Sequence, residues 1–190
     1  MKIKLFLLII ALSAITSVYG QTTESEVINV IFSSASERNY ISDPVTDQQL
    51  DLILKSGIKA PSALNNQPWK FTVIKDEAIM KNAINDAIPG NALIIVSGLV
   101  AENGSTPDFD CGLAAQNMFL AAHSLGLGAR PYGSPTRIIN RMKDRFQIPE
   151  GYQALIVLRI GNLDKSVDAV STASPRKSME EVVNVYKSSE

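Results

Sequence analysis

The chain has 190 residues, of which 45% are hydrophobic and 19% charged, and its formal net charge of −1 is ordinary for a single globular domain. A charge so close to zero gives no electrostatic basis for binding nucleic acid, so we expect no such partner. With one cysteine, Cys111, and one histidine, His123, the chain lacks an intramolecular disulfide, a zinc-binding set and a Cys-His or Ser-His nucleophile arrangement. We expect no metal and no catalytic side chain of these kinds, so the chemistry must come from a cofactor or from carboxylates.

The first 20 residues have the pattern of a secretory signal peptide. A basic start at residues 1–4 precedes an apolar run at 5–15 and small residues at 16–20. The apolar run is too short to span a bilayer, although an uncleaved anchor is the alternative. We expect residues 21–190 to form the mature domain, with a charge of about −3 after loss of two lysines and no membrane span. Export, to a periplasm or to the outside of the cell, follows from this pattern.

Hydrophobic periodicity and turn residues predict one α+β domain with a small central β-sheet surrounded by helices. Thr46 and Gln49 have the spacing of a capping box, followed by a helical face that includes Leu50, Ile53 and Ile58. The predicted strands are 71–74, 93–100, 130–133 and 154–160, and further helices are predicted at 77–87, 110–125, from Pro135 and at 175–186. In the long helix, we expect Cys111 to be a buried apolar residue and His123 to lie on the surface.

A polar arch separates the capped helix from the first strand, at Ala60-Pro61-Ser62-Ala63-Leu64-Asn65-Asn66-Gln67-Pro68-Trp69. The two prolines fix their own φ angles and favour extended geometry at the residues before them, so the arch is predicted to be stiff. The serine and the three amides between the prolines supply hydrogen-bonding groups suited to the edge of a flat heterocycle. An ordinary polar loop with a proline at each end is the alternative interpretation.

This arch resembles the APS-x-x-N-x-QPW signature of the FMN-dependent nitroreductase family. The resemblance implies that Pro61, Ser62, Ala63 and Asn65 bind the flavin. A second segment, Ser34-Ala35-Ser36-Glu37-Arg38-Asn39-Tyr40, is similar to the family's R-R-S-x-R-x-F/Y motif for the flavin phosphate and ribityl chain. Ser36, Arg38 and Tyr40 match that motif, but serine and alanine replace its two leading arginines, which predicts weaker binding of the phosphate.

Two further segments extend the resemblance. Leu125-Gly126-Leu127-Gly128-Ala129-Arg130-Pro131-Tyr132-Gly133 is similar to the family's glycine turn, which implies that Pro131, Tyr132 and Gly133 lie at the flavin. Ser174-Pro175-Arg176-Lys177 resembles the C-terminal segment whose arginine reaches the phosphate, so Arg176 is the expected compensating cation. Asp110-x-Gly112-x-Ala114-x-Gln116-Asn117 also matches the family's long helix.

The resemblance implies an FMN-dependent oxidoreductase of the nitroreductase-like fold. Hydride would pass from NAD(P)H through flavin N5 to a nitro compound, a quinone or a similar small acceptor. The family also implies a homodimer with flavin at the subunit interface and the C-terminal tail crossing to the partner. Because free NAD(P)H is not expected outside the cytoplasm, two alternatives stay open: an exported flavin-binding or scavenging protein of the same fold without NAD(P)H turnover, and a reductase fed by another electron donor.

Overall fold

The computed structural model describes residues 25–167 and 175–187, and its chain divides into two compact units, 1–32 and 33–190. The predicted signal peptide and its cleavage site lie outside the described residues. Helix α2, Glu26–Ser33, ends at the boundary between the units. Within the described ranges, no helix combines the length and the apolarity needed to cross a membrane.

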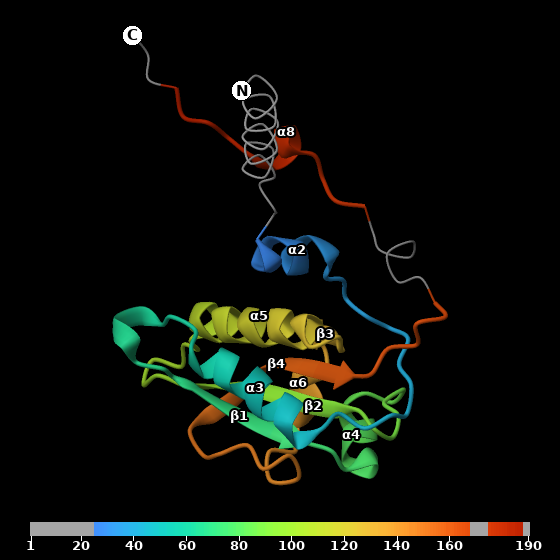
Figure 1. The fold of residues 1–190 in the computed structure, drawn as a ribbon. Coiled ribbons are helices and arrows are strands. Elements are labelled where there is room, and N and C mark those ends of the chain that lie inside the picture. The colour runs from blue at the N-terminus through green and yellow to red at the C-terminus, as the bar shows by residue number, and fades with distance from the viewer. Residues whose placement is uncertain (1–24, 168–174, 188–190) are drawn as a thin grey trace, which may run out of the picture. The chain divides into compact units, whose positions relative to one another are not determined.

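The second unit is built on a four-stranded antiparallel sheet, as Figure 1 shows. The strands are ordered β1-β2-β4-β3, with bounds β1 Trp69–Ile74, β2 Ala92–Leu99, β3 Gly128–Tyr132 and β4 Tyr152–Gly161. Strand β2 is buried on both faces along nearly its whole length, which confirms the interpretation of its continuous apolar run. The pairing of β2 with β4 shifts at Val96/Ser97. Beside this shift, Asn140 accepts a hydrogen bond from Ala154 N at 2.8 Å and donates one to Ala154 O at 2.9 Å.

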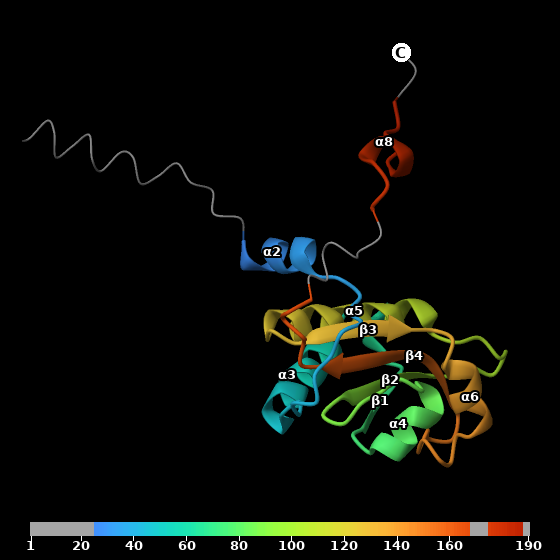
Figure 2. The ribbon, with the colours of Figure 1, turned by 90° about the vertical axis from the view of Figure 1, so that its right-hand side faces the viewer.

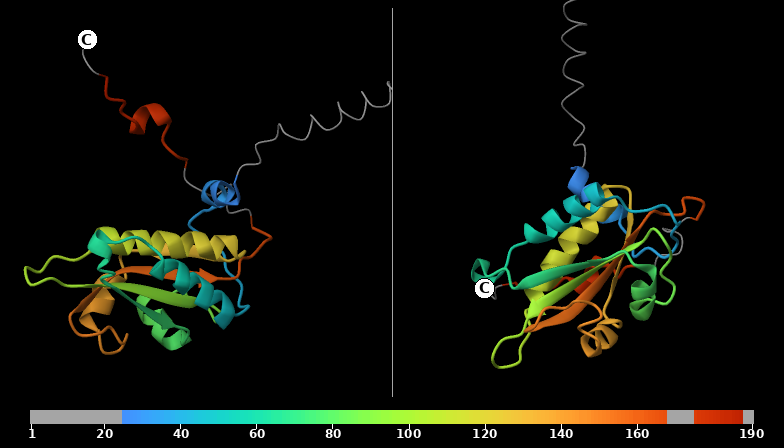
Figure 3. Two further views of the ribbon diagram at one scale, coloured as in Figure 1. Left: turned by 60° about the vertical axis from the view of Figure 1, so that its left-hand side comes forward. Right: turned by 90° about the horizontal axis from the view of Figure 1, so that it is seen from below.

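Helices cover both faces of the sheet, so the unit has three layers (Figures 2 and 3). Helices α3, Asp47–Ile58, and α5, Asp108–Ser124, pack on one face. Helices α4, Glu77–Ala83, and α6, Thr136–Arg141, pack on the other. Thr46 starts α3 with the predicted capping box, in which its hydroxyl accepts from Gln49 N at 3.2 Å and Gln49 Oε1 accepts from Thr46 N at 3.0 Å.

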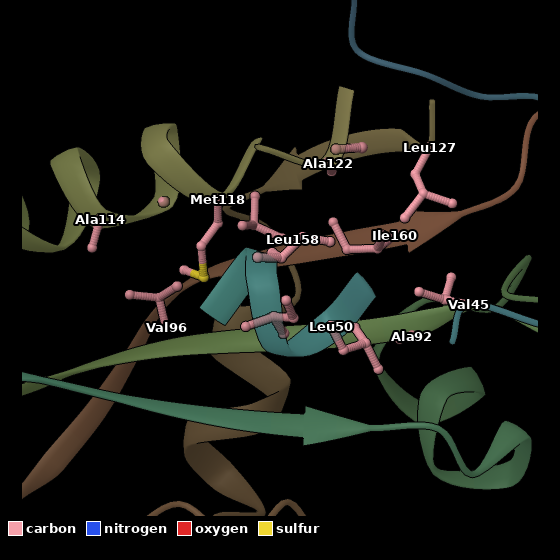
Figure 4. Packing of buried hydrophobic residues seen from close by; sticks show 14 of the residues in the cluster. Val45, Leu50, Ala92, Val96, Ala114, Met118, Ala122, Leu127, Leu158 and Ile160 are labelled. Carbon is pink, nitrogen blue, oxygen red and sulfur yellow. The ribbon is translucent and has the colours of Figure 1, made fainter. Parts of the chain in front are cut away.

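The larger core lies between α3, α5 and the sheet. Figure 4 shows Met118 of α5 among side chains of α3 and of the central strands. Gly57 lets α3 approach α5 closely, because an added Cβ there would lie 2.8 Å from Met118 Cγ. Asn117 Nδ2 also donates to Ser56 O at 3.1 Å, which ties α5 to α3 through a polar contact.

Three predictions about these elements were wrong in detail. Helix α4 ends at Ala83 because Ile84 is extended, whereas periodicity predicted helix to residue 87. Ile58 was expected on the buried face of α3 but is 55% exposed at the last turn. The C-terminal helix comprises only Met179–Val182, since Val183 is extended and β-branched residues favour that geometry.

We predict that Met118→Ala lowers the free energy of unfolding by about 2–5 kcal/mol, because the side chain is fully buried and its removal leaves a cavity. Urea denaturation measures the change. Leu52→Ala, on the half-exposed side of α3, is the control and should cost much less. Equal losses for the two variants would contradict the packing described here.

Candidate functional site

The arch of residues 60–69 is compact and carries backbone strain. Leu64, Asn65 and Gln67 have φ angles of 51°, 57° and 48°, in the left-handed region that residues other than glycine normally avoid. Extended geometry was predicted for the residue before each proline, and for Gln67 that prediction was wrong. Its N–H donates to Ser62 Oγ at 2.9 Å, a bond that closes the arch on itself.

The start of α5 holds the arch in place. Asp110 is buried, and its Oδ1 accepts a hydrogen bond from Ala63 N at 3.2 Å. Trp69, at the far end of the arch, is buried in the main core and stacks on Phe71 with ring centroids 6.3 Å apart. Between these two anchors most side chains of the arch are exposed, including that of Asn65. Backbone strain at such an exposed polar arch supports a binding role.

The segment 35–41 is attached at the other end of α5, beside β3. Glu37 N donates to Ala129 O at 3.1 Å, and Ile41 N donates to Asn162 O at 2.9 Å. Gly128 permits this close approach, because an added Cβ there would overlap Leu163 and lie 3.1 Å from Glu37 Cβ. Figures 1 and 3 show the arch at the beginning of α5 and this segment near its end.

Side chains alternate along this segment. Ser36 and Arg38 are exposed, whereas Glu37 between them is only 6% exposed, as expected for extended backbone. Burial raises the pKa of the Glu37 carboxyl. The two residues matched to the flavin motif therefore face outward together, and a buried acid lies beneath them.

A hollow of about 270 Å³ opens between α5 and the edge of the sheet. Pro131, Tyr132 and Gly133, all predicted site residues, form one wall, and Ile156 and Leu158 of β4 form the floor. Gly112 of α5 lies on the opposite wall. Added Cβ atoms on Gly112 and Gly133 would meet nothing within 4 Å, so both walls leave room for a flat group. This apolar lining with exposed backbone suits a planar aromatic ligand.

Sequence reasoning missed the helical wall of this hollow. The residues Gly112, Gln116, Phe119 and His123 recur at intervals of four, three and four, so they lie on one face of α5. The first three line the hollow, and the ring of Phe119 contacts that of His123 edge-on at 4.6 Å. The spacing alone could have revealed this stripe.

His123 was predicted to be a surface residue, and this prediction was wrong. Its ring is half-buried, its Nε2 is inaccessible to solvent, and it contacts Phe119. Burial lowers the pKa of His123, and a hydrogen bond with the Ala35 backbone opposes part of that shift. The ring thus continues the stripe of α5 residues that lines the hollow.

The arch does not join this group within one chain. Asp110, which anchors the arch, is two residues from Gly112 and therefore about 200° away around the helix axis. Along the axis, Asp110 and His123 are about 20 Å apart. Within one chain, the predicted site residues therefore fall into two groups on opposite sides of α5. One group is Ser36, Arg38 and residues 131–133, and the other is Pro61, Ser62, Ala63 and Asn65.

Two other predicted positions can be described. Arg176 is exposed and lies just before α8, whose capping box joins Ser178 and Glu181. Cys111 is fully buried, as predicted, and burial with the nearby charges of Asp110 and Asp108 raises the pKa of its thiol to about 12. It is therefore protonated at neutral pH and is no nucleophile. No group of three or more potential metal-ligating side chains occurs within residues 25–167 and 175–187.

The sequence pattern of the nitroreductase family matches residues 33–105 and 100–162. The chain belongs to the nitroreductase family. It is 31% identical over 156 residues to a Methanothermobacter thermautotrophicus protein provisionally named NADH dehydrogenase/NAD(P)H nitroreductase, an alignment that covers 75% of this chain and 80% of the relative. It is 26% identical to FMN reductase [NAD(P)H] of Bacillus subtilis, with 73% of this chain and 66% of that protein covered.

Solved structures agree with this assignment at the level of the fold. A nitroreductase with bound FMN from Bacteroides fragilis superposes with a TM-score of 0.72 at 18% identity, covering 86% of this chain and all of that one. A nitroreductase with bound FMN from Desulfitobacterium hafniense gives a TM-score of 0.71 at 20% identity, with the same coverage. The predicted α+β, nitroreductase-like fold is confirmed.

We predict that Glu37→Gln stabilises the protein at pH 7, since it removes a buried charge while keeping the shape of the side chain. Because the folded-state pKa of Glu37 is raised, the wild type loses stability as the pH rises from the ordinary value of 4.5 through the raised one. The gain should therefore be present at pH 7 and vanish at pH 4. Thermal unfolding at both values measures it, and a gain equal at the two pH values would contradict this account.

Two substitutions at Gly112 test the stability of α5 and the access of a ligand to the hollow separately. Gly112→Ala should stabilise α5 by about 0.5–1 kcal/mol, because a helix interior disfavours glycine and space for Cβ is open. Gly112→Leu should fold as well but fill the hollow and abolish flavin retention, as measured by absorbance of the purified protein. A Gly112→Leu protein that retains flavin would show that the hollow is not the flavin site.

Proposed function

We propose that this protein is an exported FMN-dependent oxidoreductase that takes electrons from NAD(P)H and passes them to a nitro compound, a quinone or a similar small acceptor. The observation that carries the proposal is the hollow beside α5, with its apolar floor and its two glycine walls. Membership of the nitroreductase family and the relative named FMN reductase support the same chemistry.

The residues present fit FMN. Pro131, Ile156 and Leu158 offer flat apolar contact for the ring system, and Gly133 lets main chain approach its edge. Exposed Ser36 and Arg38 lie on the segment that is hydrogen-bonded to β3, the strand whose Pro131 and Tyr132 line the hollow. They suit a ribityl chain and the pyrimidine edge, where a guanidinium stabilises negative charge. When bound, FMN supplies the hydride chemistry, and the protein supplies orientation and electrostatics.

A complete site requires two copies of the chain. The arch lies on the opposite side of α5 from the hollow, so the arch residues Ser62 and Asn65 cannot reach the hollow of their own chain. We infer a homodimer in which each arch meets the flavin held by its partner. Leu64, 93% exposed at the tip of the arch, and Phe109, 79% exposed beside its anchor, supply apolar surface for that contact.

The C-terminal segment supports the same assembly. Its apolar side chains are exposed in the described part of the chain, namely Met179, Val182, Val183, Val185 and Tyr186. A partner subunit would cover them and would receive Arg176 at its flavin phosphate. The proposed cations are few, since Ser34 and Ala35 occupy the positions of the two arginines in the family motif.

The signal-peptide pattern motivates the second candidate. A protein exported unfolded acquires its flavin outside the cytoplasm, where free NAD(P)H is not expected, so a flavin-binding or scavenging role is the alternative. An anaerobic absorbance experiment decides between them. Addition of NADH or NADPH to the yellow protein should bleach the flavin, and reoxidation should follow addition of a quinone. A yellow protein that neither donor bleaches would favour the flavin-binding role or another donor, whereas failure to bind any flavin would contradict both.

We predict that Arg176→Ala weakens FMN binding about ten- to a hundredfold, because it removes one of few charge-assisted contacts to the phosphate, each worth about 1.5 to 3 kcal/mol. Riboflavin, which has no phosphate, should be affected much less. Fluorescence-quenching titrations of both flavins measure this, with Lys177→Ala as the neighbouring control. Equal losses of affinity for FMN and riboflavin would mean that Arg176 contributes to assembly or folding and does not bind the phosphate.

A further inference from the structure

A buried arginine of the sheet contacts segment 35–41. Arg159 of β4 is only 2% exposed, and hydrogen bonds fix its guanidinium in one orientation. Its Nε donates to Asn91 Oδ1 at 2.8 Å, while Nη1 donates to Asp86 Oδ2 at 3.0 Å and Nη2 to Asp86 O at 2.9 Å. The proposed oxidoreductase chemistry makes no use of this buried charge.

The guanidinium of Arg159 covers the ring of Tyr40. Its Cζ lies 4.4 Å from the ring centroid. Burial raises the pKa of the Tyr40 phenol, so the ring is neutral and attracts the cation through its face. Gly161 permits this placement, because an added Cβ there would lie 2.7 Å from Tyr40 Cδ1. Tyr40 is in turn fixed within its own segment, since its hydroxyl donates to Glu37 O at 3.2 Å.

Stability alone gives little reason for an arginine at this position. Taking a charge out of water costs free energy, and an apolar side chain of similar volume is often at least as stabilising in its place. A guanidinium fixed by Asp86 and Asn91 does something that an apolar side chain cannot do: it holds the plane of the Tyr40 ring at a defined place and angle.

We propose that Arg159 is a positioning residue that holds the Tyr40 ring, and through it keeps Ser36 and Arg38 where they bind the flavin. This inference rests on the proposed function. Leu158, the preceding residue of β4, lines the hollow, so Arg159 faces the opposite side of the sheet and does not touch the flavin itself. The segment can connect the two sides, because it is hydrogen-bonded to β3, the edge strand.

The first experiment measures amide hydrogen exchange in segment 35–41 of the flavin-free mature protein by mass spectrometry. Arg159→Met keeps an unbranched side chain and removes the charge, and it leaves Asp86 solvated, because that side chain is 64% exposed. The segment donates backbone hydrogen bonds from Glu37 N and Ile41 N. Exchange of these amides should become about tenfold faster, because the segment opens more often once the ring contact is lost.

The control for this experiment is Asn140→Ala, which removes the paired hydrogen bonds to Ala154 in the same strand. It should lower the free energy of unfolding, measured by urea denaturation, and leave exchange in segment 35–41 unchanged. Arg159→Met should give the reverse result, with faster exchange in the segment and little loss of stability. A purely structural role for Arg159 would give the two variants the same pattern.

The second experiment measures riboflavin and FMN affinity by fluorescence quenching in a double-mutant cycle. Arg159→Met and Tyr40→Leu should each weaken binding of both flavins about five- to tenfold. The double variant should bind no more weakly than either single variant, because the same contact is lost in all three. Tyr40→Phe keeps the ring and should stay within about twofold of wild type. Asn140→Ala should bind like wild type.

The outcomes separate this inference from the proposed function. Unchanged exchange in Arg159→Met, unchanged flavin affinity in that variant, or losses that add in the double variant would each overturn this inference alone. A wild-type protein that binds neither flavin would overturn the proposed function, and this inference with it.

Discussion

Helix α5 is the main constraint on the candidate site, because the arch is anchored to its first turn and the hollow opens along it. Its 17 residues are fixed between α3 and the sheet by close packing of small side chains, so neither end can shift independently. Asp110 anchors the arch near its first turn, and His123, in its last turn, ends the stripe of residues that lines the hollow. A helix rises about 1.5 Å per residue, so Asp110 and His123 are about 20 Å apart along the axis. This separation is the basis for the proposal that each site is shared between two chains.

The same helix also forms one wall of the hollow, whose volume is about 270 Å³. Gly112 and Gly133 remove side-chain volume from two facing walls, while the floor is ordinary sheet surface. The strain of the arch, at three non-glycine residues with positive φ, persists because Asp110 and Ser62 supply its hydrogen bonds and Trp69 fixes its end. The candidate binding groups are thus held by rigid elements of the fold.

Much of this could be predicted from sequence, for identifiable reasons. Strand β2 is recognisable in the sequence because burial on both faces requires a continuous apolar run. Helix α3 is recognisable because a capping box stands directly before a helical pattern of apolar residues. His123 could not be placed, because the half-burial of its ring beside Phe119 depends on how α5 packs in the fold. Gln67 was mispredicted because a side-chain hydrogen bond outweighed the local preference before proline. The motif residues were found by resemblance, but their division between two sides of α5 needed the fold.

The claim that each site is shared between two chains can be tested by complementation. Arg38→Ala alters the segment side of every site, and Asn65→Ala alters the arch side, so each variant alone should retain little flavin. When the two are unfolded together and reassembled, half of the dimers should be mixed, and each mixed dimer should contain one intact site. Our account predicts that about a quarter of all sites regain bound flavin, measured by absorbance after removal of free ligand. No recovery above the separate variants would show that arch and segment act within one chain, contrary to this account.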